Sequence, residues 1–387
     1  MAISLETNFA GLRFANPLLV APGPSTNSVS EIIKGIEAGA GGFVAKTVVG
    51  DSCRMLRKWP RPRFMLPDWE KKKTNPKTYS LYSNEPAYRG TVDEYVRMLQ
   101  SLKKKVKVPV IGSLFALDLN EWSEITKRLE QDAGCDAIEL DISCPHSPEN
   151  LSEQELMGMI LEEVIKTVKI PVFVKLKPHD NLLDFVKIAE ERKVKGLVLC
   201  NRMSAIDIDL DTRTPVLFGS YAGFGGSWAK YYVFKKISEI APYTKLPISA
   251  TSGISSGEDI IKYTMLGATT AQVCTAIIVS GYSVIPRMLD GVTKFLGEHN
   301  LTSLDQLRGS ALKNILPVEN IERDPSIVAV QDTAKCTNCA RCLKICFFGA
   351  ISQHNKNIRI DSHICDGCGL CVQVCPDEAV IMKRITK

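Results

Sequence analysis

The sequence lacks any long hydrophobic segment. No run of about 18 apolar residues occurs in the chain, so no membrane-spanning helix is predicted. The amino terminus also lacks the charged-then-apolar pattern of a secretion signal. With 387 residues, 45% of them hydrophobic and 24% charged, the composition is that of a folded globular chain larger than one typical domain. We therefore expect a cytoplasmic protein without a membrane segment.

Cysteine is scarce through most of the chain and concentrated at its end. Eight of the 13 cysteines form two identical C-x-x-C-x-x-C-x-x-x-C runs that begin 29 residues apart. This spacing is typical of bacterial two-cluster ferredoxins, in which the fourth cysteine of each run binds the other cluster. Structural zinc is the alternative, but a four-ligand zinc site would leave a cysteine of each run without a role. The predicted ligands of two 4Fe-4S clusters are Cys336, Cys339, Cys342, Cys346, Cys365, Cys368, Cys371 and Cys375.

A strong excess of charge of one sign is also missing. The formal net charge is +5, but two clusters with their thiolates would add about −4. The loaded protein would then be close to neutral, and its charge gives no support for nucleic-acid binding.

Short apolar runs rich in β-branched residues alternate with amphipathic helical stretches through the first 300 residues. Eight such units match a (β/α)8 TIM barrel in number and length, and we predict this α/β fold for residues 1–300. An open doubly wound sheet is the alternative, but no strand is followed by the G-x-G-x-x-G turn of a dinucleotide site. We expect a short helix and a polar linker over 301–334 and a ferredoxin-like domain over 335–387. The predicted strands lie in "NPLLVAPG", "GGFVAKT", "PVIGSLF", "AIELDIS", "PVFVKLKP", "GLVLCNR", "PISATSG" and "TAQVCTA".

Unusual residues fall at the carboxyl ends of these strands, where barrel enzymes carry their chemistry. Taken singly, each has a structural explanation, since a strand lysine can extend to solvent and a barrel cysteine can be a small apolar filler. Taken together, they converge on one face of the barrel. Small residues after the last two strands would also let backbone N–H groups approach a phosphate. The residues are Lys46, Ser143, Cys144, Lys175, Asn201, Arg202, Ser252, Gly253, Cys274 and Thr275.

The ordered set "ELDISCPHS", "VFVKLKP", "LCNR", "FGGSWAK", "ATSGI" and "QVCTAI" resembles the flavin barrel shared by dihydroorotate dehydrogenases and dihydropyrimidine dehydrogenase. The resemblance spans nearly the whole chain. "SCPH" joined to a two-cluster tail is more similar to the dihydropyrimidine dehydrogenase branch, including its bacterial iron-sulfur subunit.

This resemblance implies an FMN over the barrel mouth. Lys175 matches the lysine at the N1/O2 edge of the flavin, where a positive charge stabilises the reduced ring. Lys46 matches a second lysine near flavin and substrate, with a catalytic role. Cys144 matches the active-site cysteine, whose thiol, with a pKa of about 8.5, can exchange a proton while a hydride moves between substrate and flavin. The implied cofactor-binding residues are Lys46, Thr47, Ser113, Lys175, Asn201, Gly225, Gly226, Ser252, Gly253, Cys274 and Thr275.

The implied substrate site differs from the family in charge. Asp141 stands where the family has an asparagine that recognises a pyrimidine edge, and a carboxylate can only accept hydrogen bonds. Arg202 replaces a small hydroxyl residue and suits either a carboxylate or Asp141 itself, so the two are expected to pair. Near "LYSNEP", Asn84 or the adjacent Ser83 matches a further substrate-facing asparagine. The implied substrate residues are Asn84, Asp141, Ser143, Asn201 and Arg202.

Three classes of function are compatible with these features. The first is an enzyme that acts on a CH–CH group or activated C=C bond of a dihydropyrimidine-like small molecule, with dihydroorotate dehydrogenase as a variant. The second is an electron-transfer subunit of a larger complex, and the third a cluster-stabilised scaffold, which would not need Cys144 or the lysines. The absence of a dinucleotide fingerprint implies that electrons reach an outside redox partner, either a flavin- or NAD(P)H-dependent reductase subunit or a ferredoxin. A homo- or hetero-oligomer is therefore expected.

Overall fold

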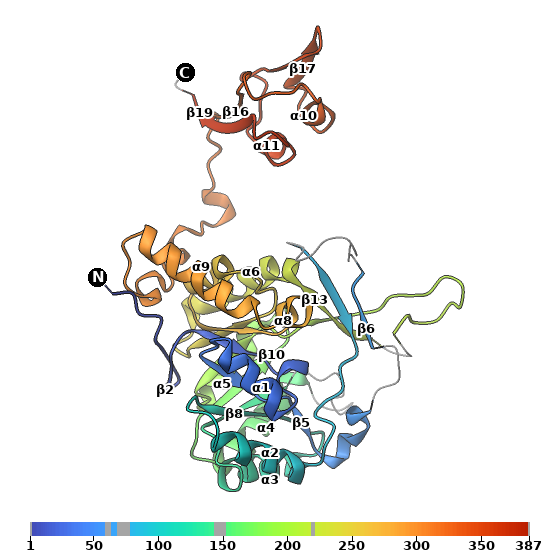
Figure 1. Cartoon of the computed structure of the whole chain (residues 1–387), viewed down its shortest axis with the longest axis vertical. Coiled ribbons are helices and arrows are strands. Elements are labelled where there is room, and N and C mark those ends of the chain that lie inside the picture. Colours follow the sequence, from blue (N-terminus) through green and yellow to red (C-terminus); the bar gives the residue numbers. More distant parts are fainter. Residues whose placement is uncertain (1, 59–62, 68–77, 143–151, 218–220, 386–387) are drawn as a thin grey trace. The chain divides into compact units, whose positions relative to one another are not determined.

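The computed structural model describes the chain except for residues 1, 59–62, 68–77, 143–151, 218–220 and 386–387. It divides into two compact units, Met1–Asn314 and Ile315–Lys387 (Figure 1). Among the described residues, no helix combines the length and apolar content needed to cross a bilayer.

The first unit is built around a closed parallel barrel. Each predicted apolar run contains a strand, and every strand pairs in parallel with the next around the ring. Pairing of Phe43 with Val110 and of Val44 with Ile111 closes the circle. The predicted barrel is therefore confirmed. Its strands are β3 (Leu18–Val20), β4 (Gly42–Val44), β8 (Val110–Phe115), β9 (Ala137–Asp141), β10 (Val172–Leu176), β11 (Gly196–Leu199), β14 (Ile248–Thr251) and β15 (Ala268–Val273), with β5 (Val48–Val49) added beside β8.

Helices surround the barrel and bury one apolar face each (Figure 1). In α2, for example, Tyr95, Leu99 and Leu102 are buried, and a capping box between Thr91 and Glu94 satisfies the first turn. The described helices of the first unit are α1 (Val29–Glu37), α2 (Val92–Lys103), α3 (Leu119–Gln131), α4 (Glu153–Thr167), α5 (Leu182–Glu191), α6 (Lys230–Ile240), α7 (Gly257–Met265), α8 (Thr275–Ser280) and α9 (Val284–Glu298). Short 3-10 turns are η1 (Pro24–Thr26), η2 (Asp51–Arg57), η3 (Ser227–Ala229) and η4 (Ala241–Tyr243).

The barrel interior changes from apolar to polar along its axis. At the amino-terminal ends of the strands, a hairpin of β1 (Thr7–Phe9) and β2 (Leu12–Phe14) inserts Phe9 and Phe14 into an apolar cluster. The rings of Phe9 and Phe173 meet edge to face with centroids 4.8 Å apart. Nearer the carboxyl ends, the buried side chains include Glu139, Lys175 and Gln272, where most barrels of this kind carry branched apolar residues.

An antiparallel sheet that the sequence did not predict stands beside the carboxyl ends of the strands. It consists of β6 (Phe64–Met65), β7 (Ser80–Ser83), β12 (Met203–Ala205) and β13 (Ala222–Gly226), in the order β12-β13-β7-β6. β13 contains three glycines, and glycine weakens the sequence signal for a strand. Pairing of Gly223 with Ser83 brings the segments after β4 and β11 together.

The segment after α9 differs from the expected short helix. It forms two 3-10 turns, η5 (Leu304–Leu307) and η6 (Leu312–Asn314), both within the first unit. Gly309 has a φ of +70° between them, a left-handed conformation that interrupts an α-helix.

The second unit has two halves related by the 29-residue repeat of the sequence. It begins with η7 (Val318–Asn320), and β16 (Ile327–Gln331) then pairs with β19 (Val380–Arg384). β17 (Ile351–His354) forms a hairpin with β18 (Asn357–Ile360). One-turn helices α10 (Arg341–Lys344) and α11 (Leu370–Gln373) follow each C-x-x-C segment.

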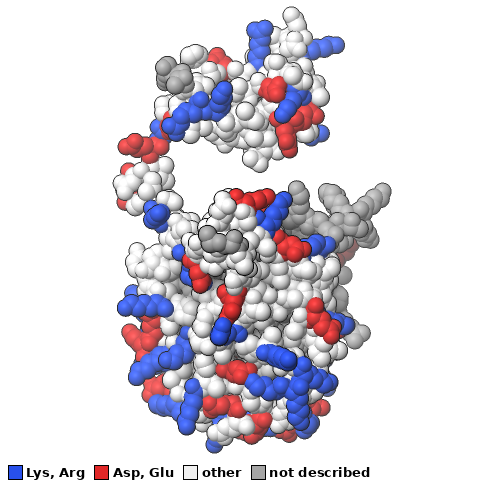
Figure 2. Space-filling model, turned by 60° about the vertical axis from the view of Figure 1, so that its left-hand side comes forward, with Lys and Arg blue, Asp and Glu red and all other residues white. Residues whose placement is uncertain are grey.

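Charged side chains of both signs are interspersed over the visible face of the barrel unit (Figure 2). Many form exposed ion pairs, such as Arg128 with Asp93 at 2.7 Å and Lys166 with Glu162 at 2.8 Å. Pairs of this kind contribute little stability singly.

The apolar end of the barrel gives a stability prediction. Phe9→Ala should lower the free energy of unfolding by about 3–5 kcal/mol, because the lost ring leaves a cavity that the surrounding strands cannot close. Tyr243→Ala, at a side chain that is 69% exposed, is the control and should change it by less than about 0.5 kcal/mol. Urea unfolding followed by circular dichroism measures both; equal effects would contradict the packing described here.

Candidate active site and cluster cavities

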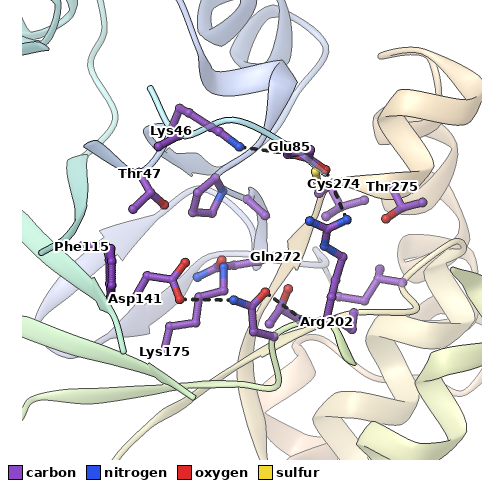
Figure 3. Close-up of a pocket in the computed structure, with 18 of the residues that line it drawn as sticks. Lys46, Thr47, Glu85, Phe115, Asp141, Lys175, Arg202, Gln272, Cys274 and Thr275 are labelled. Carbon is purple, nitrogen blue, oxygen red and sulfur yellow. Dashed lines mark hydrogen bonds and ion pairs between the residues drawn. The ribbon is translucent and has the colours of Figure 1, made fainter. Parts of the chain in front are cut away.

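A cavity of about 320 Å³ lies at the carboxyl ends of the barrel strands (Figure 3). This volume is within the range of small-molecule sites. The sequence-predicted residues on its wall are Lys46, Thr47, Asp141, Lys175, Asn201, Arg202, Gly226, Ser252, Gly253, Cys274 and Thr275.

The floor of the cavity carries a buried ion pair. Lys175 Nζ lies 3.3 Å from Glu139 Oε1, and Gln272 Nε2 donates a 2.8 Å hydrogen bond to Glu139 Oε2. Lys175 and Gln272 line the cavity, whereas Glu139 lies behind them and is fully buried. Gln272 Oε1 is buried and accepts no hydrogen bond from the described residues. The floor thus offers a cationic donor and an acceptor to a ligand.

One wall carries a second charge network. The carboxylate of Glu85 lies 3.1 Å from Lys46 Nζ and 3.4 Å from Arg202 Nη1. Burial opposes ionisation of Glu85, but Lys46 and Arg202 outweigh burial and lower its pKa to about 2. Glu85 therefore stays ionised at neutral pH and holds two cations at the cavity.

Arg202 lies along the glycines of β13. A Cβ on Gly223 would come within 2.6 Å of Arg202 Cζ, so the absent side chain leaves space for the guanidinium, which donates to Ser83 Oγ. The described residues show no ion pair between Arg202 and Asp141, so this expectation was wrong. Pairing of β7 with β13 places Glu85 beside Arg202 instead. Asn201 Nδ2 donates a 3.2 Å hydrogen bond to Asp141 Oδ1.

Backbone turns close the opposite side of the cavity. Gly253 has a φ of +78°, and a Cβ there would lie 2.2 Å from the backbone nitrogen of Lys230. Gly226 has a φ of +145°, and its Cβ would lie 2.0 Å from Tyr79 O. Only glycine fits at either position. Here the absent side chains make room for the backbone of Lys230 and Tyr79. Ser252, Cys274 and Thr275 are also on this wall, and because all five residues are small, an anion in the cavity could approach the backbone.

Three predicted residues lie behind the wall. Ser113 is buried and its hydroxyl is 3.0 Å from that of Thr47. Gly225 lies next to Gly226 in β13 under the aliphatic part of Arg202. Asn84 is buried, and its backbone N–H donates to Arg63 O at 2.9 Å. Ser143 and Cys144 lie outside the described residues.

Sequence reasoning missed Glu85, Gln272 and Glu139. Glu85 directly follows the proposed Asn84, and the strand that places it was not predicted. Glu139 and Gln272 stand in the mostly buried strands "AIELD" and "ATTAQV". A charged or amide side chain in a strand buried on both faces needs a polar partner, and this signal could have identified them.

The second unit contains two small cavities, each lined by four cysteines. One is lined by Cys365, Cys368 and Cys371 together with Cys346. The other is lined by Cys336, Cys339, Cys342 and Cys375. In each cavity, the fourth cysteine of one run stands beside the first three of the other.

Backbone groups point at several of these sulfurs. The N–H groups of Ala329, Asn338 and Ala379 donate to Cys365, Cys336 and Cys375 at 3.4, 3.4 and 3.2 Å. Backbone N–H groups thus face the sulfurs of three of the eight cysteines. The donor set and its surroundings therefore fit iron-sulfur clusters.

Comparison with known proteins agrees with these features. Residues 4–296 match the family model described as dihydroorotate dehydrogenase, and residues 335–380 match the 4Fe-4S dicluster domain. The catalytic subunit of dihydroorotate dehydrogenase B (NAD(+)) from Methanocaldococcus jannaschii is 30% identical over 318 residues, which cover 79% of this chain and 98% of that protein. The corresponding subunit from Thermoplasma volcanium is 31% identical over 314 residues, covering 80% and 99%.

A relative from Escherichia coli extends over both units. The NAD-dependent dihydropyrimidine dehydrogenase subunit PreA is 28% identical over 393 aligned residues, which cover 96% of this chain and 93% of that protein. The family expected from the sequence motifs is thus confirmed. The chain belongs to the dihydroorotate dehydrogenase family, as a flavin and iron-sulfur oxidoreductase in which a 4Fe-4S dicluster domain follows the barrel.

Proposed function

We propose that the protein is an FMN-dependent oxidoreductase that forms or reduces a C=C bond next to a carbonyl in a dihydropyrimidine-like molecule. Two 4Fe-4S clusters exchange the electrons with a partner. The observation that carries the proposal is one barrel cavity with a lysine floor and glycine turns, joined in the same chain to two four-cysteine cavities.

The cavity fits FMN in three respects. The part of the wall formed by Gly226, Ser252, Gly253, Cys274 and Thr275 carries no bulky side chain, which suits a phosphate. Gln272 Oε1 supplies an acceptor with no protein partner among the described residues. Lys175 supplies a positive charge that favours the reduced ring. When bound, FMN supplies hydride transfer between its own ring and a substrate carbon.

The protein's own groups then have distinct tasks. Cys144 is proposed as the proton donor or acceptor at the neighbouring carbon, on the basis of its sequence context. Lys46, fixed by Glu85, places a positive charge where negative charge develops on the substrate. Asp141, Asn201 and Arg202 orient the substrate and restrict its chemistry.

The restriction follows from hydrogen-bond type. Asp141 can accept but not donate when ionised, and Arg202 can donate but not accept. Uracil presents carbonyl oxygens as well as N–H groups. Where the family amide would donate to a carbonyl oxygen of uracil, the Asp141 carboxylate can only accept, so two acceptors face each other. Substrates with a carboxylate, including dihydroorotate, remain the alternative, and Arg202 favours them.

An outside electron partner is part of the proposal. The E. coli relative is named as a subunit of an NAD-dependent enzyme, and this chain contains no dinucleotide fingerprint. We infer a hetero-oligomer with a reductase subunit, or electron exchange with a ferredoxin. A relay role without chemistry in the barrel is the second candidate, which turnover by the isolated chain with an artificial electron donor would exclude.

The cofactor content can be measured directly. Protein purified without oxygen should contain about eight irons and one FMN per chain, because each cavity of four cysteines suits one four-iron cluster. Iron and flavin assays on the same sample provide the numbers. Stoichiometric zinc with little iron would contradict the proposal.

The proposed proton transfer depends on Cys144. Cys144→Ala should leave flavin and clusters bound while slowing the chemical step about 10² to 10⁴-fold, the usual contribution of a positioned acid or base. Cys53→Ala, at a buried cysteine outside the cavity wall, is the matched control. Pre-steady-state flavin reduction measures the step, and a wild-type rate in C144A would refute the role.

Substrate choice depends on Asp141 and Arg202. The wild type should use uracil and thymine poorly, and Asp141→Asn with Arg202→Thr should raise kcat/KM for uracil at least about tenfold, since each mismatch of hydrogen-bond type costs about 1–3 kcal/mol. Glu85 keeps Lys46 as a partner in this variant. Asp132→Asn with Arg128→Thr removes an exposed pair and serves as control. Efficient uracil reduction by the wild type would remove the basis for this prediction.

A further inference from the structure

The most deeply buried charge in the barrel interior belongs to Glu139, which has no contact with the cavity of its own. It is 0% exposed, and among the described residues Lys175 and Gln272 connect it to the cavity. A carboxylate at such depth costs several kcal/mol unless it is paired. A structural apolar residue would avoid this cost, so the position of Glu139 behind the floor lysine requires an explanation.

The geometry couples Glu139 to the charge that Lys175 presents to the cavity. The two groups lie 3.3 Å apart, and Gln272 holds the second carboxylate oxygen at 2.8 Å. While Glu139 is ionised, the pair is close to neutral. If Glu139 takes up a proton, the full positive charge of Lys175 acts on whatever lies above the floor, with no movement of the backbone.

We propose that Glu139 is a positioning residue that controls, by gaining or losing one proton, how much of the positive charge of Lys175 reaches the flavin. This inference rests on the proposed function, in which FMN occupies the cavity. Reduction of the flavin adds negative charge, which favours the state with Glu139 protonated and Lys175 charged. The proton comes from solvent, and no electron passes through either residue.

The surroundings of Glu139 make such a proton exchange accessible. Burial raises the pKa of Glu139. The charge of Lys175 and the hydrogen bond from Gln272 offset part of that rise, whereas Asp141 on the same strand adds to it. Tyr95 of α2 also faces this region, with its hydroxyl bonded to the backbone of Ser113. Burial raises the pKa of Tyr95 well above its usual value, so it stays neutral while Glu139 titrates.

The sign of the effect follows from linkage. Negative charge on the reduced flavin raises the pKa of Glu139 further. Between the pKa that Glu139 has beside oxidised flavin and the higher pKa that it has beside reduced flavin, reduction therefore takes up one additional proton. Within that range, the midpoint potential falls more steeply with rising pH than it would without Glu139. At higher pH, ionised Glu139 neutralises Lys175 and the potential is lower than with a neutral residue at this position.

The test compares flavin midpoint potentials of wild type and Glu139→Gln between about pH 6 and 10, with the clusters in place. Gln removes the charge and keeps one acceptor oxygen, which can take the bond from Gln272, while its NH2 group replaces the second acceptor. Where wild-type Glu139 is ionised, E139Q should favour the reduced flavin at least tenfold, or about 30 mV for a two-electron couple. The midpoint potential of E139Q should also lack the pH range in which the wild-type potential falls more steeply.

Thr270→Val is the matched control. Thr270 lies two residues before Gln272 in β15, its hydroxyl is buried, and it has no partner among the described residues. T270V perturbs the interior without changing charge and should leave the potential and its pH dependence unchanged. An equal shift in T270V, or identical curves for E139Q and wild type, would overturn the inference.

Two further outcomes separate this inference from the proposed function. If wild-type protein binds no FMN, the proposed function fails. If E139Q loses flavin, Glu139→Asp decides: it keeps a carboxylate but moves it away from Lys175, so the steeper portion should persist at a displaced pH. A curve for E139D that superimposes on the wild type would overturn the role of Glu139.

Discussion

The site depends on closure of the parallel sheet. Once β4 pairs with β8, the carboxyl ends of all the barrel strands meet at one rim, and side chains far apart in the sequence become neighbours. Lys46 and Cys274 are separated by more than half the chain, yet both line the same cavity. The hairpin carrying Phe9 and Phe14 fills the other end with apolar rings, so the polar interior opens only toward the rim.

Buried charge then has to be compensated where the strands meet. Lys175 and Glu139 form one pair below the cavity, and Lys46, Glu85 and Arg202 form a second group beside it. The two networks differ in balance. The first has one cation and one anion, whereas the second has two cations for one carboxylate, because Glu85 is shared. Asp141 also lines the cavity, so the two groups and Asp141 together contain three basic and three acidic side chains.

The sequence was sufficient to predict the barrel, because the spacing and the length of its apolar runs are typical of strands that are buried on both faces. It also identified 11 of the 24 residues that line the cavity, since their positions at strand ends follow from the same runs. It did not predict the partner of Arg202. That partner depends on the pairing of β7 with β13, whose glycines carry no apolar pattern, and on the register that sets Gly223 opposite Ser83. Asp141 was the reasonable expectation when only strand order was known.

The partner of Lys175 was missed for a different reason. Glu139 lies in a strand that was correctly predicted, but the inward or outward direction of each side chain depends on how the barrel closes. In the cysteine unit, by contrast, the spacing matches the pattern of two-cluster ferredoxins, whose crossed arrangement was therefore expected, and the lining of the two cavities has the same crossing. The cysteines there also form part of the apolar cluster with Ala329, Ile351 and Val380. Clusters bound in these cavities would each join both halves of the repeat, so the same eight residues would hold the electron carriers and cross-link a unit whose own apolar core is small.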